Sequence, residues 1–254
     1  MGAAGGAQAL IVANEMQRPD NGFVGRWAGS SAVAVGEHWV LTAAHVGGSV
    51  GNNFRMQRRS FEATAMIRHH SADLILVRVA EALPGWHGIT GDVSKRDRVV
   101  LAGVGHTAGA QVGKHGLDWT GELRAAWGEN TIQNVQGDTL AMRYFAKGKK
   151  ALPHEAAFAY RDSGGGVFLQ GADGTLALAG VAVGASDFGR TMHGSMSYAL
   201  SLGSYLDWIA EATNGEVDVL GAGRVDGVGY ALPAPGGVAT LAMLAVLGAR
   251  RRRG

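Results

Sequence analysis

The chain contains no cysteine, only five prolines, and charged residues at just 17% of its 254 positions. The absence of cysteine excludes a disulfide framework, a thiolate metal site and a cysteine nucleophile, but leaves the redox compartment open. Wholesale disorder is also excluded, because 46% of the residues are hydrophobic and disordered chains combine low hydrophobicity with high net charge. The length predicts one large domain or two small ones with a substantial buried core.

Net charge gives little support for a nucleic-acid partner. The formal charge is +2, but residues 250–253 are all arginine, and removing these four charges leaves −2 for the rest of the chain. The sequence pI of about 9.0 therefore reflects a basic tail and not a basic surface on a folded domain. We predict no nucleic-acid binding.

Glycine is abundant, with 41 residues or about twice the usual share, which predicts many tight turns. Short apolar runs bounded by Gly, Asp or Asn predict strands. They cover residues 31–35, 39–43, 73–79, 98–104, 140–145, 167–170 and 176–183. Leu202, Tyr205, Leu206 and Ile209 have helical spacing, and Asn214-Gly215 provides a stop. Many short strands with one terminal helix predict an all-β barrel or sandwich.

The N-terminal segment, residues 1–9, ends in Ala7-Gln8-Ala9, the A-x-A pattern of a signal-peptidase site. It predicts the remnant of a signal peptide, and the alternative is a frayed Ala/Gly-rich terminus, since neither a basic region nor a long apolar run comes before it. Near the other end, residues 215–230 carry five glycines and little periodicity, which predicts a linker.

Three segments carry residues for nucleophilic catalysis. His45 follows the apolar run WVLT, Asp73 opens ADLILVRV, and Ser163 lies in the glycine-rich segment RDSGGG. A serine hydroxyl needs an imidazole to accept its proton, and the imidazole needs a carboxylate to orient it. Taken singly, these residues are better explained as a strand-end histidine, a strand cap and an ordinary turn. Together they predict a Ser-His-Asp triad.

These motifs resemble those of the trypsin-like (chymotrypsin-fold) serine proteases, with T-A-A-H, D-L-I-L-V and D-S-G-G in the order His, Asp, Ser over most of residues 10–214. The resemblance implies two six-stranded antiparallel β-barrels with a C-terminal helix, no cofactor or metal, and a polypeptide substrate. Ser163 would be the nucleophile, His45 the general base and Asp73 the orienting carboxylate. The backbone N–H groups of Arg161 and Ser163 would form the oxyanion hole.

The substrate pocket implied by the resemblance comprises Ala157, Phe158, Val183 and Gly184. Ala157 would form its floor, and the lack of an acid there predicts uncharged side chains before the scissile bond, unless an acid such as Asp187 enters the pocket.

Other positions depart from the family pattern. Arg161 stands where the family has glycine, and its Cβ is expected to turn the oxyanion donor and slow the reaction. Ala182 replaces a serine that usually contacts the triad carboxylate, so Thr42 becomes a candidate partner of Asp73.

Asp162 precedes the nucleophile, and in much of the family this carboxylate binds a newly cut N-terminal ammonium. Cleavage after Ala9 would create such a terminus at Leu10, directly before Ile11-Val12, which is similar to the family's Ile-Val start. The alternative is that Asp162 binds only local donors. Either way, a buried carboxylate needs partners.

The C-terminal segment, residues 231–254, has Pro-Ala-Pro-Gly, an apolar stretch and the arginine cluster. It resembles a PEP-CTERM sorting signal, which implies export, transient membrane anchoring and trimming by an exosortase-type enzyme. A permanent anchor or a disordered basic tail is the alternative. The sequence thus predicts an exported serine endopeptidase at the cell envelope or surface. Its rivals are a catalytically impaired binding module of the same fold and a surface-displayed structural scaffold.

Overall fold

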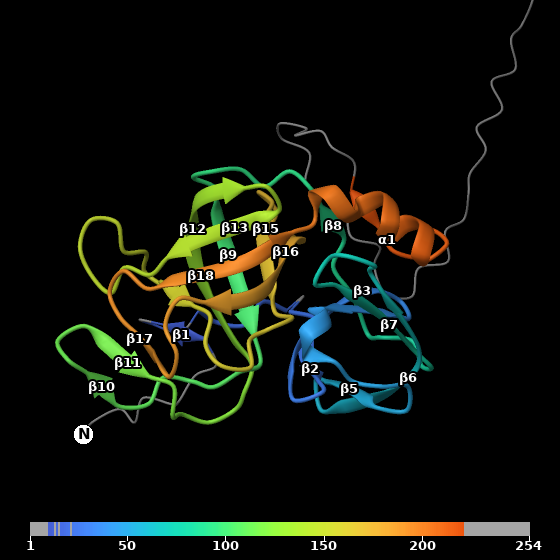
Figure 1. Cartoon of the computed structure of the whole chain (residues 1–254), viewed down its shortest axis with the longest axis horizontal. Coiled ribbons are helices and arrows are strands. Elements are labelled where there is room, and N and C mark those ends of the chain that lie inside the picture. Colours follow the sequence, from blue (N-terminus) through green and yellow to red (C-terminus); the bar gives the residue numbers. More distant parts are fainter. Residues whose placement is uncertain (1–9, 13, 15, 21, 221–254) are drawn as a thin grey trace, which may run out of the picture.

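A computed structural model describes residues 10–12, 14, 16–20 and 22–220. The predicted signal-peptide remnant, the sorting segment and residues 221–230 of the predicted linker lie outside these ranges. The strands gather into two bodies side by side, with the N-terminal half of the chain in one and most of the C-terminal half in the other (Figure 1). In the described part of the chain, no helix is long and apolar enough to cross a membrane.

The first body is a closed six-stranded antiparallel barrel. Its strands follow the order β2-β3-β4-β7-β6-β5. Their bounds are β2 Val24–Trp27, β3 Ser30–Gly36, β4 Trp39–Thr42, β5 Asn53–Met56, β6 Arg59–Arg68 and β7 Ile75–Val79. A single 3₁₀ turn, η1 (Ala44–Val46), follows β4 and carries His45.

The second body is also a closed antiparallel barrel of six strands, because β15 pairs with both β9 and β16 and so completes the ring β15-β9-β12-β13-β18-β16. The bounds are β9 Arg98–Gly103, β12 Ala126–Gln136, β13 Thr139–Arg143, β15 Gly166–Gln170, β16 Leu176–Ala185 and β18 Met196–Ser201. The predicted architecture of two six-stranded barrels is confirmed.

Short strands surround the second barrel. They are β1 (Ile11–Val12), which pairs with β14 (Ala156–Ala157), β8 (Ile89–Thr90) with β19 (Val219–Leu220), and β10 (Gln111–Val112) and β17 (Arg190–Thr191), which flank β11 (Gly116–Asp118). Because β19 pairs with β8 and Val217 is buried, the predicted linker does not begin at residue 215. Val217 and Val219, near the start of the predicted linker, pack against the apolar layer between the barrels.

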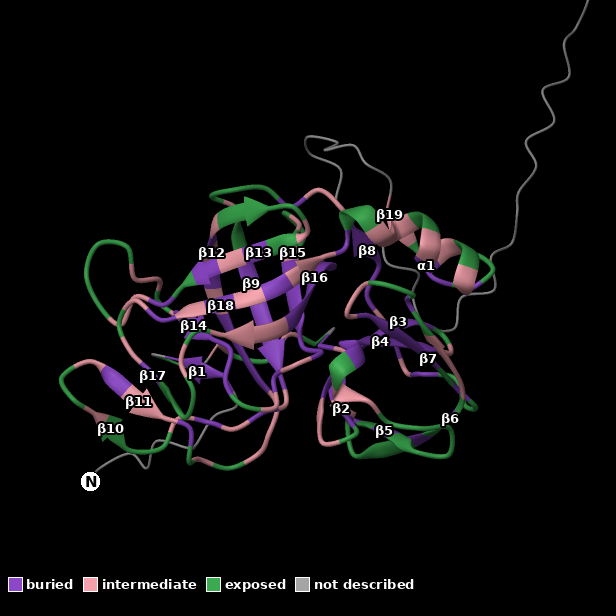
Figure 2. Cartoon of the chain, viewed as in Figure 1, coloured by how far each residue is buried: buried purple, intermediate pink, exposed green. Residues whose placement is uncertain are grey.

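Both faces of the central strands are buried, which explains their uninterrupted apolar runs (Figure 2). On β3, Ala32 and Ala34 face the interior of the first barrel, while Val33 and Val35 join the apolar layer between the barrels. Strand β9 repeats this pattern in the second barrel. The two barrels therefore share one continuous apolar contact layer.

The C-terminal helix, α1 (Leu206–Ala212), follows a 3₁₀ turn, η2 (Gly203–Tyr205). Leu202 and Ile209 are fully buried in the layer between the barrels, and Tyr205 and Leu206 pack against it. The predicted apolar face is confirmed, although the α-helix itself begins only at Leu206. Asn214 and Gly215 end it with positive φ angles of 51° and 75°.

Candidate active site

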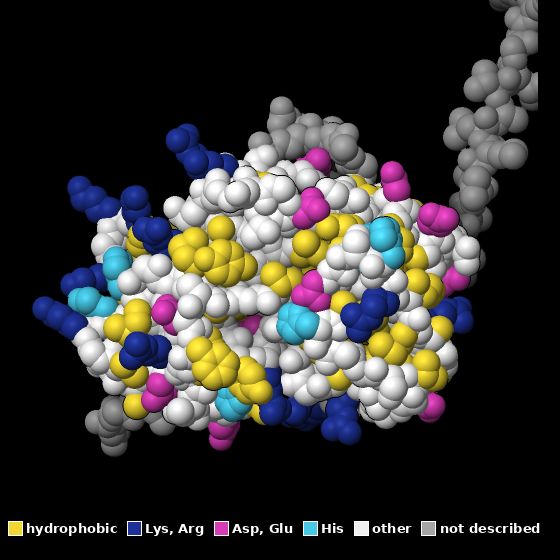
Figure 3. All heavy atoms as spheres, viewed as in Figure 1, with side chains coloured by type: hydrophobic (Ala, Val, Ile, Leu, Met, Phe, Trp, Pro, Cys, Tyr) yellow, Lys and Arg dark blue, Asp and Glu magenta, His cyan; other side chains and the backbone are white. Residues whose placement is uncertain are grey.

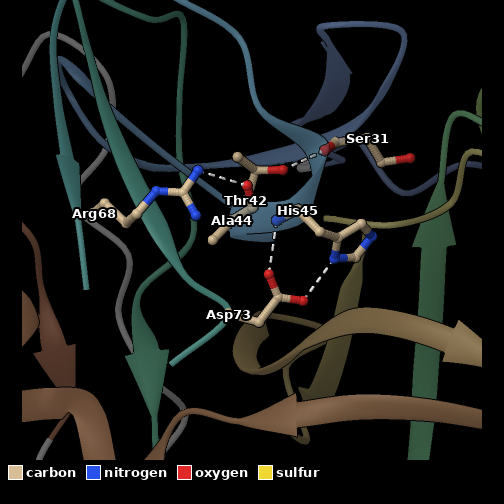
Figure 4. A network of polar contacts seen from close by, with 6 residues as sticks. All are labelled: Ser31, Thr42, Ala44, His45, Arg68 and Asp73. Atoms are coloured by element: carbon tan, nitrogen blue, oxygen red, sulfur yellow. Dashed lines mark hydrogen bonds and ion pairs between the residues drawn. The ribbon is translucent and has the colours of Figure 1, made fainter. Parts of the chain in front are cut away.

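His45 and Asp73 form a directly bonded pair at the edge of the first barrel (Figure 4). One carboxylate oxygen of Asp73 lies 2.6 Å from Nδ1 of His45, and the other accepts the backbone N–H of His45 at 2.7 Å. The carboxylate thus fixes both the ring and the backbone of His45, and leaves Nε2 free to act as a base. The side chains remain 47% and 35% exposed.

Two further contacts hold the turn that carries His45. The guanidinium of Arg68 donates to the carbonyl oxygen of Ala44 at 3.0 Å (Figure 4). Thr42, the candidate partner of Asp73, instead donates its hydroxyl to the carbonyl oxygen of Ser31 at 2.8 Å. The expectation for Thr42 was wrong because its side chain points to β3, toward the second barrel.

The Ser163 loop belongs to the second barrel but is docked on β3 of the first. The backbone N–H of Ser31 donates to the carbonyl oxygen of Ser163 at 3.0 Å, and the Ser31 hydroxyl donates to that of Arg161 at 3.1 Å. Gly164 has φ +84°, and a Cβ there would collide with Ser31 and Thr42. Only glycine permits this close approach, which brings Ser163 next to the strand that leads to His45.

Two backbone donors of this loop have no acceptor in the part of the chain that the structure describes. The N–H groups of Asp162, Gly164 and Gly165 each donate to a described carbonyl oxygen. Those of Arg161 and Ser163 donate to none among the residues that the structure describes. Buried or half-buried N–H groups are normally bonded, so an unpaired pair beside a serine is suited to a developing oxyanion. Across the described ranges, the Ser163 hydroxyl also makes no hydrogen bond to His45.

Arg161 adopts a conformation that favours glycine, with φ +73°. The Cβ of Arg161 is accommodated in this conformation at a cost in backbone strain. Its guanidinium lies 5.5 Å from the ring centre of Tyr160.

Arg161→Gly is expected to raise the free energy of unfolding by up to about 1 kcal/mol, or about 2–4 °C in the thermal midpoint, because glycine relieves this strain. Arg161→Ala retains the Cβ and should give no such gain. Any turnover of a small ester should rise in both variants, because the arginine side chain lines a pocket beside Ser163. Calorimetry measures the two thermal midpoints. Equal midpoints for Arg161→Gly and Arg161→Ala would contradict backbone strain at this position.

A pocket of about 140 Å³ lies beside Ser163. Its lining comprises Trp119, Phe158, Ala159, Tyr160, Arg161, Ser163, Ala182, Gly184, Ala185, Asp187 and Phe188. Of the predicted pocket residues, Phe158 and Gly184 are present. Ala157 is not, because it is buried in β14 and pairs with Ile11. Val183 is also absent from the lining and packs against the apolar layer between the barrels.

The sequence analysis did not predict that Trp119, Tyr160 and Phe188 line this pocket. Tyr160 and Phe188 are 49% and 86% exposed, and the Phe188 ring lies 6.1 Å from that of Trp119. Tyr160 directly precedes the Ser163 motif in the sequence, and this position could have predicted that it lies at the pocket. Trp119 and Phe188 come from loops distant in sequence. Asp187 is the acid that the sequence analysis named as able to alter the predicted preference for uncharged side chains. It lines the pocket and accepts a hydrogen bond from the hydroxyl of Ser195.

Asp162 is fully buried behind the Ser163 loop. One carboxylate oxygen accepts the N–H of Ala159 at 2.7 Å, while the other accepts no hydrogen bond of normal geometry. Burial raises the pKa of Asp162 from 3.8 to about 8, against a lowering effect of the backbone N–H groups of Ala159, Gly105 and Leu10. The carboxyl group thus has a local donor, and the backbone of Leu10 faces it. No cluster of three metal-ligating side chains occurs among the described residues.

Mouse neuropsin, a serine protease expressed in the limbic system of the brain, has a similar structure. It matches 78% of this chain and 97% of its own, with a TM-score of 0.60 and 15% sequence identity. The chain has the chymotrypsin fold. Neuropsin is one of 637 solved chains whose structures match this one. No protein-family model and no curated protein sequence matches the chain. His45 and Asp73 lie on the first barrel, and Ser163 precedes β15 of the second barrel.

Proposed function

We propose that this protein is a serine endopeptidase that hydrolyses peptide bonds through an acyl-enzyme. The observations that carry the proposal are the N–H groups of Arg161 and Ser163, which are unpaired among the described residues and lie beside a pocket, and the bonded His45–Asp73 pair. The solved relative in fold is itself a serine protease.

In the proposed reaction, the Ser163 hydroxyl oxygen attacks the carbonyl carbon while Nε2 of His45 takes its proton. The carbonyl oxygen becomes negatively charged and accepts the N–H groups of Arg161 and Ser163. As the C–N bond breaks, His45 returns the proton to the leaving amine. A water molecule, deprotonated by His45, then attacks the ester carbon, and His45 returns this proton to the Ser163 oxygen as the ester C–O bond breaks. Asp73 stabilises the imidazolium through the 2.6 Å contact with Nδ1.

The second candidate is a catalytically impaired binding module of the same fold. The exposure of the His45–Asp73 pair and the missing hydrogen bond between Ser163 and His45 favour it. However, hydrogen bonds between catalytic side chains are often stretched in the absence of substrate and shorten in the reacting complex. We therefore favour the enzyme.

Labelling with a fluorophosphonate probe tests the proposal. The protein should react at Ser163, and the Ser163→Ala variant should not. Ser204→Ala is a matched control, because Ser204 is exposed near the start of α1 and bonds Asp138. A folded protein that stays unlabelled would favour the binding module.

The pocket predicts uncharged, medium-sized apolar side chains before the scissile bond. Arg161 and Asp187 both line it, so its charges cancel, and Asp187 already accepts two serine hydroxyls. A lysine or arginine would lose hydration without an unopposed anion to replace it. We expect apolar residues to exceed them by at least about tenfold in kcat/KM in a peptide library.

Asp187→Asn provides the control for this preference. If apolar residues are favoured by the pocket as a whole, the variant should keep the same order. Dominant cleavage after arginine or lysine, lost in Asp187→Asn, would overturn the prediction and make Asp187 the specificity residue.

Export and sorting complete the proposal, and both rest on the sequence of the two ends. Ala7-Gln8-Ala9 supports cleavage by a signal peptidase, and residues 231–254 support transient membrane anchoring and trimming by an exosortase-type enzyme. The protein would then act at the cell envelope or surface.

A further inference from the structure

A second hollow, of about 400 Å³, lies on the first barrel and is lined by cationic and amide side chains. Arg26 and Arg55 line it together with Asn52, Asn53 and the turn glycines Gly29 and Gly51. No acidic side chain lines it. Neither arginine forms an ion pair with any described acid. In Figure 3, Lys and Arg side chains gather along the lower edge of the molecule, in the region of β2 and β5.

The register of the strands places the two arginines side by side. Arg26 on β2 lies directly opposite Arg55 on β5, and opposite residues of antiparallel strands have their side chains on one face. Two cations in such positions repel each other, and nothing among the described residues neutralises them. An anion held between the two guanidinium groups would remove this repulsion and accept several charge-assisted hydrogen bonds.

The same register leads from this hollow to Ser163. Arg26 also lies directly opposite Ser31 on β3, and Ser31 bonds the carbonyl oxygens of both Ser163 and Arg161. Ser31, Arg26 and Arg55 thus form a row across three adjacent strands, on the face that meets the Ser163 loop. With neighbouring strands about 4.8 Å apart, the row extends roughly 10 Å from Ser31.

Arg161 approaches both hollows. It lines the apolar pocket, and a Cβ added at Gly29, on the rim of the cationic hollow, would be 3.9 Å from its Nη1. The apolar pocket is lined by residues of the second barrel and the cationic hollow by residues of the first, and the Ser163 loop meets the first barrel at Ser31. A polypeptide whose acyl part fills the apolar pocket would send its leaving part along the row of Ser31, Arg26 and Arg55.

We propose that Arg26 and Arg55 bind a carboxylate side chain of the substrate, two to four residues after the scissile bond. An extended chain advances about 3.3 Å per residue, so this number of residues covers the row. The inference rests on the proposed function and adds a substrate class to it: polypeptides with acidic residues on the leaving-group side.

Matched fluorogenic peptides test the inference. They carry Glu or Gln at the second to fourth residues after the scissile bond, or Glu at the corresponding residues before it. We expect kcat/KM to be about tenfold higher for Glu after the bond, as for a pair of charge-assisted hydrogen bonds. The preference should shrink as salt is raised, because part of the site is exposed. Equal preference for Glu on either side of the bond would overturn the assignment of the hollow.

Variants localise the effect. Arg26→Gln and Arg55→Gln should each reduce the preference for Glu, and the double variant should abolish it while cleavage of the Gln peptide is unchanged. Arg143→Gln removes an exposed arginine from β13 of the second barrel and should leave the preference intact. A preference that survives in the double variant would refute the proposal.

Binding separates this inference from the proposed function. Fluorescence anisotropy of the same peptides on Ser163→Ala needs no turnover. Tighter binding of the Glu peptide, lost in the triple variant with Arg26→Gln and Arg55→Gln, would support the site even if no hydrolysis were seen. Equal binding of Glu and Gln peptides would overturn it. The assignment would also be overturned if single-stranded DNA bound to Arg26 and Arg55 without displacing the Glu peptide, because the peptide would then bind elsewhere.

Discussion

Ser163→Ala is expected to lower kcat on a peptide or ester substrate by about 10⁶-fold, because in the proposed reaction the nucleophile and its general base act as one unit. His45→Ala should cost a similar factor, and the double variant no more than either alone. Asp73→Asn should cost about 10⁴-fold, since an amide stabilises the imidazolium less and favours the wrong tautomer of His45.

Single-turnover kinetics on a fixed ester measures these losses, with Ser204→Ala as the control for a serine outside the site. Multiplicative losses in the Ser163/His45 double variant would show that the two side chains do not act on the same proton transfer. Unchanged turnover in Asp73→Asn would show that the 2.6 Å contact with His45 is structural only.

Cleavage after Ala9 is expected to stabilise the fold by about 3–5 kcal/mol at neutral pH, by providing an ammonium at Leu10 for the buried carboxylate of Asp162. The supporting observations are the fully buried carboxyl group, its oxygen without a normal hydrogen bond, and the backbone of Leu10 facing it. Because Asp162 adjoins Ser163, the same cleavage should fix the loop and raise turnover.

The pH dependence of unfolding distinguishes the cut and uncut chains. In the uncut chain the pKa of Asp162 is raised from 3.8 to about 8, so the folded state binds more protons in that interval. Its stability should therefore fall as pH rises from about 4 to about 8. In the cut chain the ammonium lowers the pKa of Asp162, so stability should be lost only as pH falls through that lowered value.

Denaturant unfolding at several pH values measures this, and uncut Asp162→Asn is the control, since a neutral amide should remove the loss between about pH 4 and about pH 8. Identical pH profiles for the cut and uncut chains would contradict an ammonium partner. Active enzyme whose N-terminus lies well upstream of Leu10 would do the same, and would leave Ala159 as the principal donor to Asp162.

The sequence predicted the candidate catalytic residues from motifs of a few consecutive residues. His45, Asp73 and Ser163 each lie in a short pattern whose chemistry is local: a strand end, a strand start and a glycine turn. The structure bonds His45 to Asp73 and places Ser163 at the rim of a pocket beside two unpaired N–H groups. The helix near residue 206 was likewise predicted, because a 3.6-residue period is local information.

Tertiary structure alone decided which residues surround these motifs. Alternation along β3 and β9 could not show that both faces are buried, one inside a barrel and one between barrels. The pocket wall depends on loops that meet only after folding, so Ala157 and Val183 were misplaced and Trp119 and Phe188 were missed. The row of Ser31, Arg26 and Arg55 depends on strand register, since pairing is set by which side chains pack across strands. Local sequence patterns identified the candidate reactive groups, and the closure of two barrels decided which residues surround them.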